Sequence, residues 1–214
     1  MRRTVWEDVV VDQPQAEQLT AALGLPPVVA RLLAQRGIVE PDRAARFLNP
    51  TLDQLHDPLR LAGMRDAVTR IRQAIARGES IVVHGDFDVD GMTATAIVRR
   101  AIELAGGQVA HFVPDRAKDG YGLHAASIDR LHAAGARLII SVDCGIRSAE
   151  AALRATALGV DLIITDHHEP ETALPAAFAV INPKRPDCSY PEKMLAGAGV
   201  ALKLAQALLA DDPR

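Results

Sequence analysis

The stretch that decides the fold is Ile81-Val-Val-His-Gly-Asp-Phe-Asp-Val-Asp-Gly91. It begins as an apolar run typical of a buried parallel strand, and the segment after it has the pattern of a helix. The histidine and three aspartates therefore follow the carboxyl end of a strand, where open α/β sheets carry their functional groups. Three aspartates within five residues repel one another unless a cation neutralises them, so this turn predicts a metal site.

A purely structural role for the turn is the alternative. A carboxylate in such a turn can cap the next helix and interact with its positive end. That role explains one aspartate better than it explains three. The spacing also differs from an EF-hand calcium loop, because the chain continues after Gly91 as Met-Thr-Ala-Thr-Ala, which favours a helix.

Short apolar runs alternate with helical segments from residue 80 onwards. Predicted strands span 81–84, 108–113, 137–142, 161–165 and 179–182, and predicted helices span 92–105, 125–134, 148–158 and 197–210. This alternation predicts an α/β fold with a doubly wound, mostly parallel five-stranded sheet. Residues 1–78 show helical patterns broken by prolines, so we expect an all-helical leader at 1–78 and a catalytic domain at 79–214.

Composition excludes several classes of protein. The 214 residues carry a net charge of −3 and only 3% aromatic residues, so the chain lacks the basic face and stacking platform of a long nucleic-acid groove. No apolar run approaches the roughly 18 residues of a membrane span, and we expect a cytoplasmic protein without membrane attachment. Two separated cysteines exclude a disulfide framework and a cysteine zinc site. Phosphate-loop, dinucleotide and nucleophile-elbow motifs are absent.

Acids and histidines follow two further predicted strands. Asp143 comes after the run 138–142, and Asp166-His167-His168-Glu169 comes after 162–165. Because the carboxyl ends of parallel strands share one edge, we expect both groups to converge on the turn at 84–90. Alone, Asp143 could equally cap the following helix. The combined carboxylates and imidazoles suit Mn²⁺ or a similar ion. Two ions about 3.5–4 Å apart would hold a phosphoryl group for in-line hydrolysis.

These motifs resemble the DHH phosphoesterase superfamily, which is named for the triad seen here as Asp166-His167-His168. Within it, the chain is similar to the RecJ-type single-strand-specific DNA exonucleases over nearly all of its length. Further segments carry this resemblance: Val113-Pro-Asp-Arg116, Asp119-Gly-Tyr-Gly-Leu123, Ser141-Val-Asp-Cys-Gly145, Ile181-Asn-Pro-Lys-Arg-Pro186, Leu195-Ala-Gly-Ala-Gly-Val200 and, in the leader, Arg46-Phe-Leu-Asn-Pro-Thr-Leu52 and Leu55-His-Asp-Pro58.

The resemblance implies a centre of two Mn²⁺ or Mg²⁺ ions. In the family pattern Asp143 bridges the two ions and His167 binds the second, and the metal ligands are His84, Asp88, Asp90, Asp143 and His167. His168 faces the scissile phosphate, where an imidazole stabilises developing charge.

The resemblance also implies supporting residues. Asp86 is counted with Asp143 and His168 in the catalytic group, and both Asp86 and Asp166 orient neighbouring ligands. Candidate phosphate contacts, each explained equally well as a solvated surface residue, are Arg116, Lys118 and Arg147.

The function implied by the resemblance is that of a metal-dependent 5′-to-3′ exonuclease. It would release mononucleotides from single-stranded DNA during DNA repair and recombination. We expect a monomer, with single-strand-binding protein and a helicase as candidate partners. One alternative is a DHH phosphodiesterase or phosphatase for short oligonucleotides, cyclic dinucleotides or other small phosphoesters. Another is a catalytically incomplete fragment or scaffold.

The last alternative follows from a departure from the family pattern. A fourth motif, an aspartate that binds the second metal, belongs downstream of the helix predicted at 197–210, whereas the sequence ends at Arg214. Asp211 and Asp212 lie at the far end of that helix and are poor substitutes. We therefore expect a C-terminally truncated part of a longer enzyme, without the DNA-binding domain of the complete protein.

Overall fold

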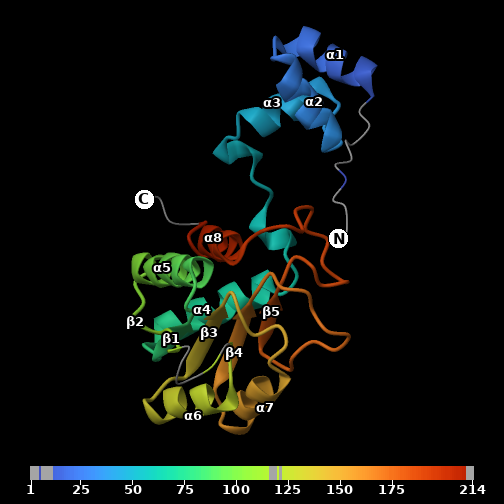
Figure 1. Ribbon diagram of the computed structural model, residues 1–214. Coiled ribbons are helices and arrows are strands. Elements are labelled where there is room, and N and C mark those ends of the chain that lie inside the picture. The colour runs from blue at the N-terminus through green and yellow to red at the C-terminus, as the bar shows by residue number, and fades with distance from the viewer. Residues whose placement is uncertain (1–4, 6–11, 116–119, 121, 211–214) are drawn as a thin grey trace. The chain divides into compact units, whose positions relative to one another are not determined.

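The computed structural model describes residue 5, residues 12–115, residue 120 and residues 122–210, and the chain divides into two compact units, Met1–Leu55 and His56–Arg214 (Figure 1). The described part of the first unit is helical, as predicted. Its helices are α1 (Gln13–Leu23), α2 (Pro27–Gln35), α3 (Pro41–Leu48) and the 3₁₀ turn η1 (Leu52–Gln54). Proline begins α2 and α3, where its fixed φ suits a first helical turn and its missing N–H costs nothing.

The second unit is built on a five-stranded parallel sheet, which confirms the predicted fold class. Its strands are β1 (Ile81–His84), β2 (Val109–Phe112), β3 (Leu138–Val142), β4 (Asp161–Thr165) and β5 (Ala179–Ile181). Their order is β2-β1-β3-β4-β5, and every pairing is parallel. The order reverses between β1 and β3, and ligands of doubly wound sheets bind at such a switch point.

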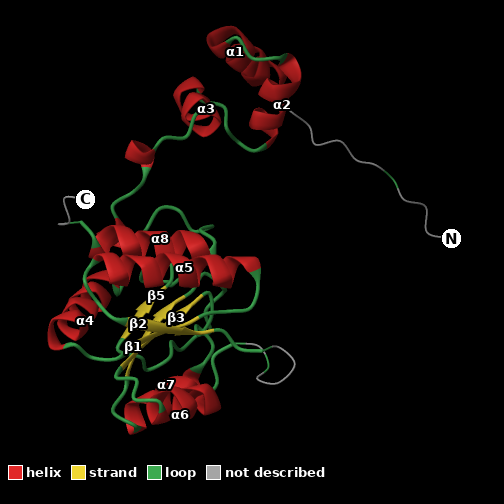
Figure 2. Ribbon diagram, turned by 90° about the vertical axis from the view of Figure 1, so that its left-hand side faces the viewer, coloured by secondary structure: helices red, strands yellow, loops and turns green. Residues whose placement is uncertain are grey.

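Helices cover both faces of this sheet (Figure 2). One face packs against α4 (Met64–Arg77), α5 (Val89–Leu104) and α8 (Gly197–Leu208), and the other against α6 (Ala125–Ala133) and α7 (Ala149–Ala157). Successive residues of β1 alternate between the two cores: Ile81 and Val83 join the first, and Val82 joins the second. All five residues of β3 are buried, which explains its continuous apolar sequence.

The boundary between the two units lies at Leu55–His56, whereas the expected boundary was 78/79. The difference is due to the 3₁₀ turn η2 (Pro58–Arg60) and to α4, both of which belong to the second unit. Met64, Ala67, Ile71 and Ala74 form an apolar stripe at helical spacing and are fully buried in the core of the α/β unit. An amphipathic pattern predicts such a stripe but does not identify the surface that covers it.

Helix α5 begins at Val89, three residues before the predicted start. Asp88 is its N-cap, and its Oδ1 accepts a hydrogen bond from the Gly91 amide at 2.9 Å. Asp90 therefore lies in the first turn of the helix and not in the preceding loop. The capping role proposed as the alternative is thus correct for Asp88.

The packing of α4 predicts how fragments will behave. We expect residues 56–214 to unfold cooperatively near the midpoint of the whole chain, because their core is complete. Residues 79–214 should be largely unfolded, since burying each large apolar side chain contributes about 1.5–3 kcal/mol and a domain is stable by only about 5–15 kcal/mol. Urea unfolding followed by circular dichroism tests this. A fragment 79–214 as stable as 56–214 would contradict it.

Candidate metal centre

Three neighbouring strands bring the predicted site residues together. His84 ends β1, Asp143 follows β3, and Asp166 follows β4. In the register of the sheet, His84 lies beside Ser141, and Val142 lies beside Thr165. The three chain segments therefore leave the sheet at the same edge, as the parallel arrangement predicts.

Asp143 occupies the centre of this edge. Its backbone is in the left-handed region at φ 61°, which is unusual for a residue with a side chain and occurs most often at functional positions. The side chain is 1% exposed. Burial raises the pKa of Asp143 to about 8, and the negative charges of Asp90, Asp88, Asp166 and Asp86 add to the rise. A nearby cation would be needed to keep this carboxylate ionised at neutral pH.

Two clusters of potential ligand atoms share Asp143. One contains Asp143, His167 and His168, and the other contains Asp86, Asp88 and Asp143. Within each cluster the ligand atoms lie within 4.8 Å of one another. A carboxylate common to both clusters has the position that a bridging ligand takes between two ions.

His167 completes a third trio of ligand atoms. Its Nε2 lies 3.1 Å from Asp143 Oδ1 and 3.6 Å from Asp90 Oδ2. The buried Asp143 Oδ1 nevertheless accepts no hydrogen bond from a described residue, so the 3.1 Å approach is close without hydrogen-bond geometry. Ligand atoms that face one cation have this arrangement. The family pattern implies that Asp90, Asp143 and His167 are metal ligands, and the structure brings these three side chains together.

Asp166 organises the DHH turn. Its Oδ1 accepts hydrogen bonds from the backbone amides of His167 at 2.7 Å and His168 at 3.1 Å, and lies 2.7 Å from His168 Nδ1. Its Oδ2 accepts from the Ile146 amide at 2.9 Å. Both oxygens are therefore engaged within the protein, and the contact at Nδ1 holds the His168 ring with Nε2 on its far side.

The three aspartates of the turn at 84–90 have different surroundings. Asp86 is buried, which raises its pKa, and its Oδ1 accepts from the Phe87 amide at 2.7 Å. Asp88 is exposed and caps α5. Asp90 accepts from the amides of Gly197 and Ala198 at the start of α8, at 2.7 and 2.6 Å.

His84 lies outside the two clusters that share Asp143. Its ring is fully buried at the end of β1, with Nδ1 3.8 Å from Cys144 Sγ. The ring also packs at a tilt against Phe112, with 5.3 Å between ring centroids. Cys144 and Phe112 therefore fix the position of the ring at the end of β1.

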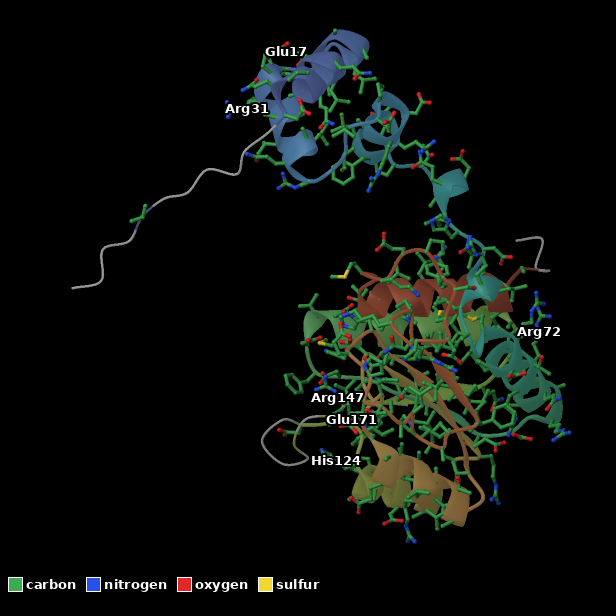
Figure 3. All side chains as sticks on the ribbon, turned by 90° about the vertical axis from the view of Figure 1, so that its right-hand side faces the viewer. Glu17, Arg31, Arg72, His124, Arg147 and Glu171 are labelled. Carbon is green, nitrogen blue, oxygen red and sulfur yellow. The ribbon has the colours of Figure 1, made fainter. Side chains whose placement is uncertain are left out.

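A groove of about 680 Å³ adjoins His168 on the side of α6 and α7. Arg147 and His124 line it and lie on the same side of the α/β unit in Figure 3. The Arg147 Nε donates to the Glu169 carbonyl at 3.0 Å, which places this guanidinium beside the DHH turn. The other two candidate phosphate contacts, Arg116 and Lys118, lie outside the described residues.

Comparison with known proteins identifies the family of this site. The model of the DHH family, N-terminal domain, matches residues 80–213. The chain belongs to the DHH family. Its first matched residue is close to the expected start of the catalytic domain at 79, and the match includes all three strand ends of the site.

Relatives of this DHH chain are RecJ exonucleases. The single-stranded-DNA-specific exonuclease RecJ of Bacillus subtilis is 43% identical over 208 residues, which are 97% of this chain and 26% of the relative. RecJ of Escherichia coli is 43% identical over 185 residues, 86% of this chain and 31% of the relative. The crystal structure of Thermus thermophilus RecJ in complex with Mn²⁺ has a TM-score of 0.73 and 33% identity, covering 92% and 27% of the two chains.

These matches confirm the resemblance to RecJ-type enzymes that the sequence motifs indicate. The chain spans roughly a quarter to a third of the length of these curated relatives. The side chains at the site of this DHH domain also have the chemistry to bind Mn²⁺. Carboxylate oxygens and imidazole nitrogens suit Mn²⁺, and the buried Asp143 Oδ1, which accepts no hydrogen bond from the described part of the chain, is placed to receive a cation.

Sequence reasoning did not assign a role to Gly197, Ala198 or Asn182. The two amides at the start of α8 bind Asp90, and the buried Asn182 donates from Nδ2 to the His168 carbonyl at 2.9 Å. The sequence contains a signal for the first pair, because a glycine that opens a helix often marks a close approach of the backbone to an anion. It contains no comparable signal for Asn182.

The raised pKa of Asp143 predicts that the metal-free chain loses stability as pH rises from about 4 to about 8. Over this range the unfolded chain ionises Asp143 near the ordinary pKa of 3.8, whereas the folded chain keeps it protonated up to about 8. Each unit of raised pKa corresponds to about 1.4 kcal/mol at most. Asp143→Asn removes this effect, so the variant should exceed wild type in stability at pH 8 and match it near pH 4.

Urea unfolding in the presence of a chelator measures this difference. Asp129→Asn serves as the control, because Asp129 is an exposed acid on α6 that pairs with Arg154 away from the site. A variant Asp143→Asn that is less stable than wild type at pH 8 would rule out the proposed electrostatic cost.

Proposed function

We propose that this chain is the metal-binding part of an exonuclease that degrades single-stranded DNA from its 5′ end to mononucleotides. The main support is the pair of ligand clusters that share the buried Asp143. The chain is also 43% identical to relatives named as single-stranded-DNA-specific exonucleases. Mn²⁺ or Mg²⁺ ions bound there would neutralise the phosphodiester and activate water.

The proposal gives each side chain a distinct task. The metal ions would be held by His84, Asp88, Asp90, Asp143 and His167, and Asp143 would be the ligand common to both ions. His168 would face the scissile phosphate, since Asp166 holds its Nδ1 and the residue lines the groove, which leaves Nε2 for the substrate. Asp86 lies within the cluster of Asp88 and Asp143, where it orients both carboxylates or joins them as a ligand.

The groove beside His168 supports a nucleotide substrate. Its volume of about 680 Å³ lies within the range of sites that bind small ligands, such as a nucleotide unit. Arg147 stands at this groove and can contact a phosphate of the bound nucleotide. A groove of this size beside His168 is consistent with binding of the terminal nucleotide of a DNA strand.

The cellular setting is part of the same proposal. The enzyme would act in DNA repair and recombination as a monomer, with single-strand-binding protein and a helicase as partners. Its two buried free cysteines suit the reducing cytoplasm. Among the described residues, no helix is both long and apolar enough to cross a bilayer.

Removing the shared carboxylate tests the metal centre. In a version of the chain extended at its C-terminus, Asp143→Ala should lower turnover of 5′-labelled single-stranded DNA in Mn²⁺ by at least about a thousandfold, since metal-bound charge stabilises the reaction by several kcal/mol. Asp129→Ala should leave turnover unchanged. Normal activity of Asp143→Ala would sink the proposal. Comparing 5′- and 3′-labelled strands establishes the polarity, and comparing extended and unextended chains shows whether this domain suffices.

Arg147 provides a separate test of the groove. We expect Arg147→Ala to lower kcat/KM about 10–100-fold, because a hydrogen bond to a charged group contributes about 1.5–3 kcal/mol. Arg147→Lys should recover part of the loss by restoring the charge. The matched control is Arg154→Ala. Arg154 is an exposed arginine of α7 that pairs with Asp129. Equal kcat/KM values for Arg147→Ala and Arg154→Ala would exclude Arg147 from substrate binding.

A small phosphoester is the second candidate substrate. The net charge of −3 favours it over a long polyanion. Hydrolysis of dinucleotides or cyclic dinucleotides faster than that of long 5′-phosphorylated strands would establish this candidate in place of the exonuclease.

A further inference from the structure

Helix α8 begins directly against the carboxylate of Asp90. The Gly197 amide donates to Asp90 Oδ2 at 2.7 Å, and the Ala198 amide donates to Oδ1 at 2.6 Å. The N-cap residue Ala196 has no side-chain hydrogen bond to these amides. An acid from the first turn of α5 therefore caps α8 across more than a hundred residues of sequence.

Gly197 also packs against Asp143. A Cβ placed on Gly197 would overlap the Asp143 side chain, 2.6 Å from Cγ and closer still to Oδ1. A larger residue would therefore displace either Asp143 or the start of α8. Gly199 differs, since a Cβ there would lie 3.3 Å from the flexible end of the Leu195 side chain.

We propose that the start of α8 is a positioning element of the metal centre, with Gly197 as its positioning residue. Its amides hold Asp90, and its missing side chain lets Asp143 lie beside Asp90. Both acids are then opposite His167 Nε2, at 3.6 and 3.1 Å, before an ion arrives. This inference rests on the proposed metal centre.

The physical basis is the repulsion between the two carboxylates. Amides at a helix N-terminus carry partial positive charge and favour a nearby anion. They offset part of the repulsion while leaving further lone pairs of Asp90 Oδ2 facing His167. Ligands held in place in advance lose less conformational freedom when a cation binds, which increases affinity.

A second contact restrains the helix itself. Lys203 of α8 is 2% exposed, and its Nζ donates to the His56 carbonyl and to Gln206 Oε1, both at 2.9 Å. Residues of α8 also pack into the core with α4 and α5. The N-terminus of α8 is therefore held by the body of the unit as well as by Asp90, which makes it a fixed support for the acids.

Mn²⁺ binding to the whole chain, measured by calorimetry, tests the inference. We expect Gly197→Ala to weaken Mn²⁺ binding at least tenfold, because the added methyl group moves Asp143 away from Asp90 and His167. Gly199→Ala, on the same helix, should stay within twofold of wild type. Wild-type affinity in Gly197→Ala, or equal losses in both variants, would overturn the inference. Absence of Mn²⁺ binding in wild type would instead overturn the metal centre itself, and the inference with it.

A second variant tests the same inference if Gly197→Ala does not fold. Ala198→Pro removes the amide that donates to Asp90 Oδ1 and keeps Gly197 beside Asp143, and proline is tolerated in a first helical turn. We expect a fold similar to that of wild type by circular dichroism and Mn²⁺ binding several-fold weaker. Unchanged Mn²⁺ affinity in Ala198→Pro would overturn the inference.

Discussion

Repulsion among carboxylates at the carboxyl edge of the sheet is the constraint on which this site depends. Four other aspartates add to the raised pKa of Asp143. All four accept hydrogen bonds from backbone amides: Asp86 from Phe87, Asp88 from the start of α5, Asp90 from the start of α8, and Asp166 from three amides of neighbouring turns. A fold that places so much like charge together must supply opposite charge at the same place.

Asp143 differs from these acids. It is buried, it has a left-handed backbone, and its Oδ1 accepts no hydrogen bond from a described residue. Among the described residues, Asp143 Oδ1 therefore has no amide contact like those of the other acids, and Asp143 belongs to both groups of potential ligands. A cation would therefore stabilise Asp143 more than the other acids. Because Asp143 belongs to both ligand clusters, it is also the acid that could contact two ions.

Much of this arrangement could be predicted from the sequence because parallel sheets follow simple rules. Strand boundaries at β1 and β4 agree with the predicted segments to the residue, and the convergence of His84, Asp143 and Asp166 follows from strands that end on one edge. The predicted leader boundary differs because the burial of α4 depends on a surface formed elsewhere in the chain. The start of α5 differs because Asp88 caps it within the acidic turn.

The sequence by itself determined the fold class, the residue types of the site and the strand ends that carry them, since apolar periodicity and the alternation of strands with helices are local properties of the chain. Only the tertiary structure decided which backbone amides and neighbouring residues each acid of the site contacts. The contact of Gly197 with Asp143, the two amides on Asp90 and the support of His168 by Asn182 join residues distant in sequence. Such contacts depend on how α8 and the loop before it pack on the sheet, and packing is a property of the whole folded unit.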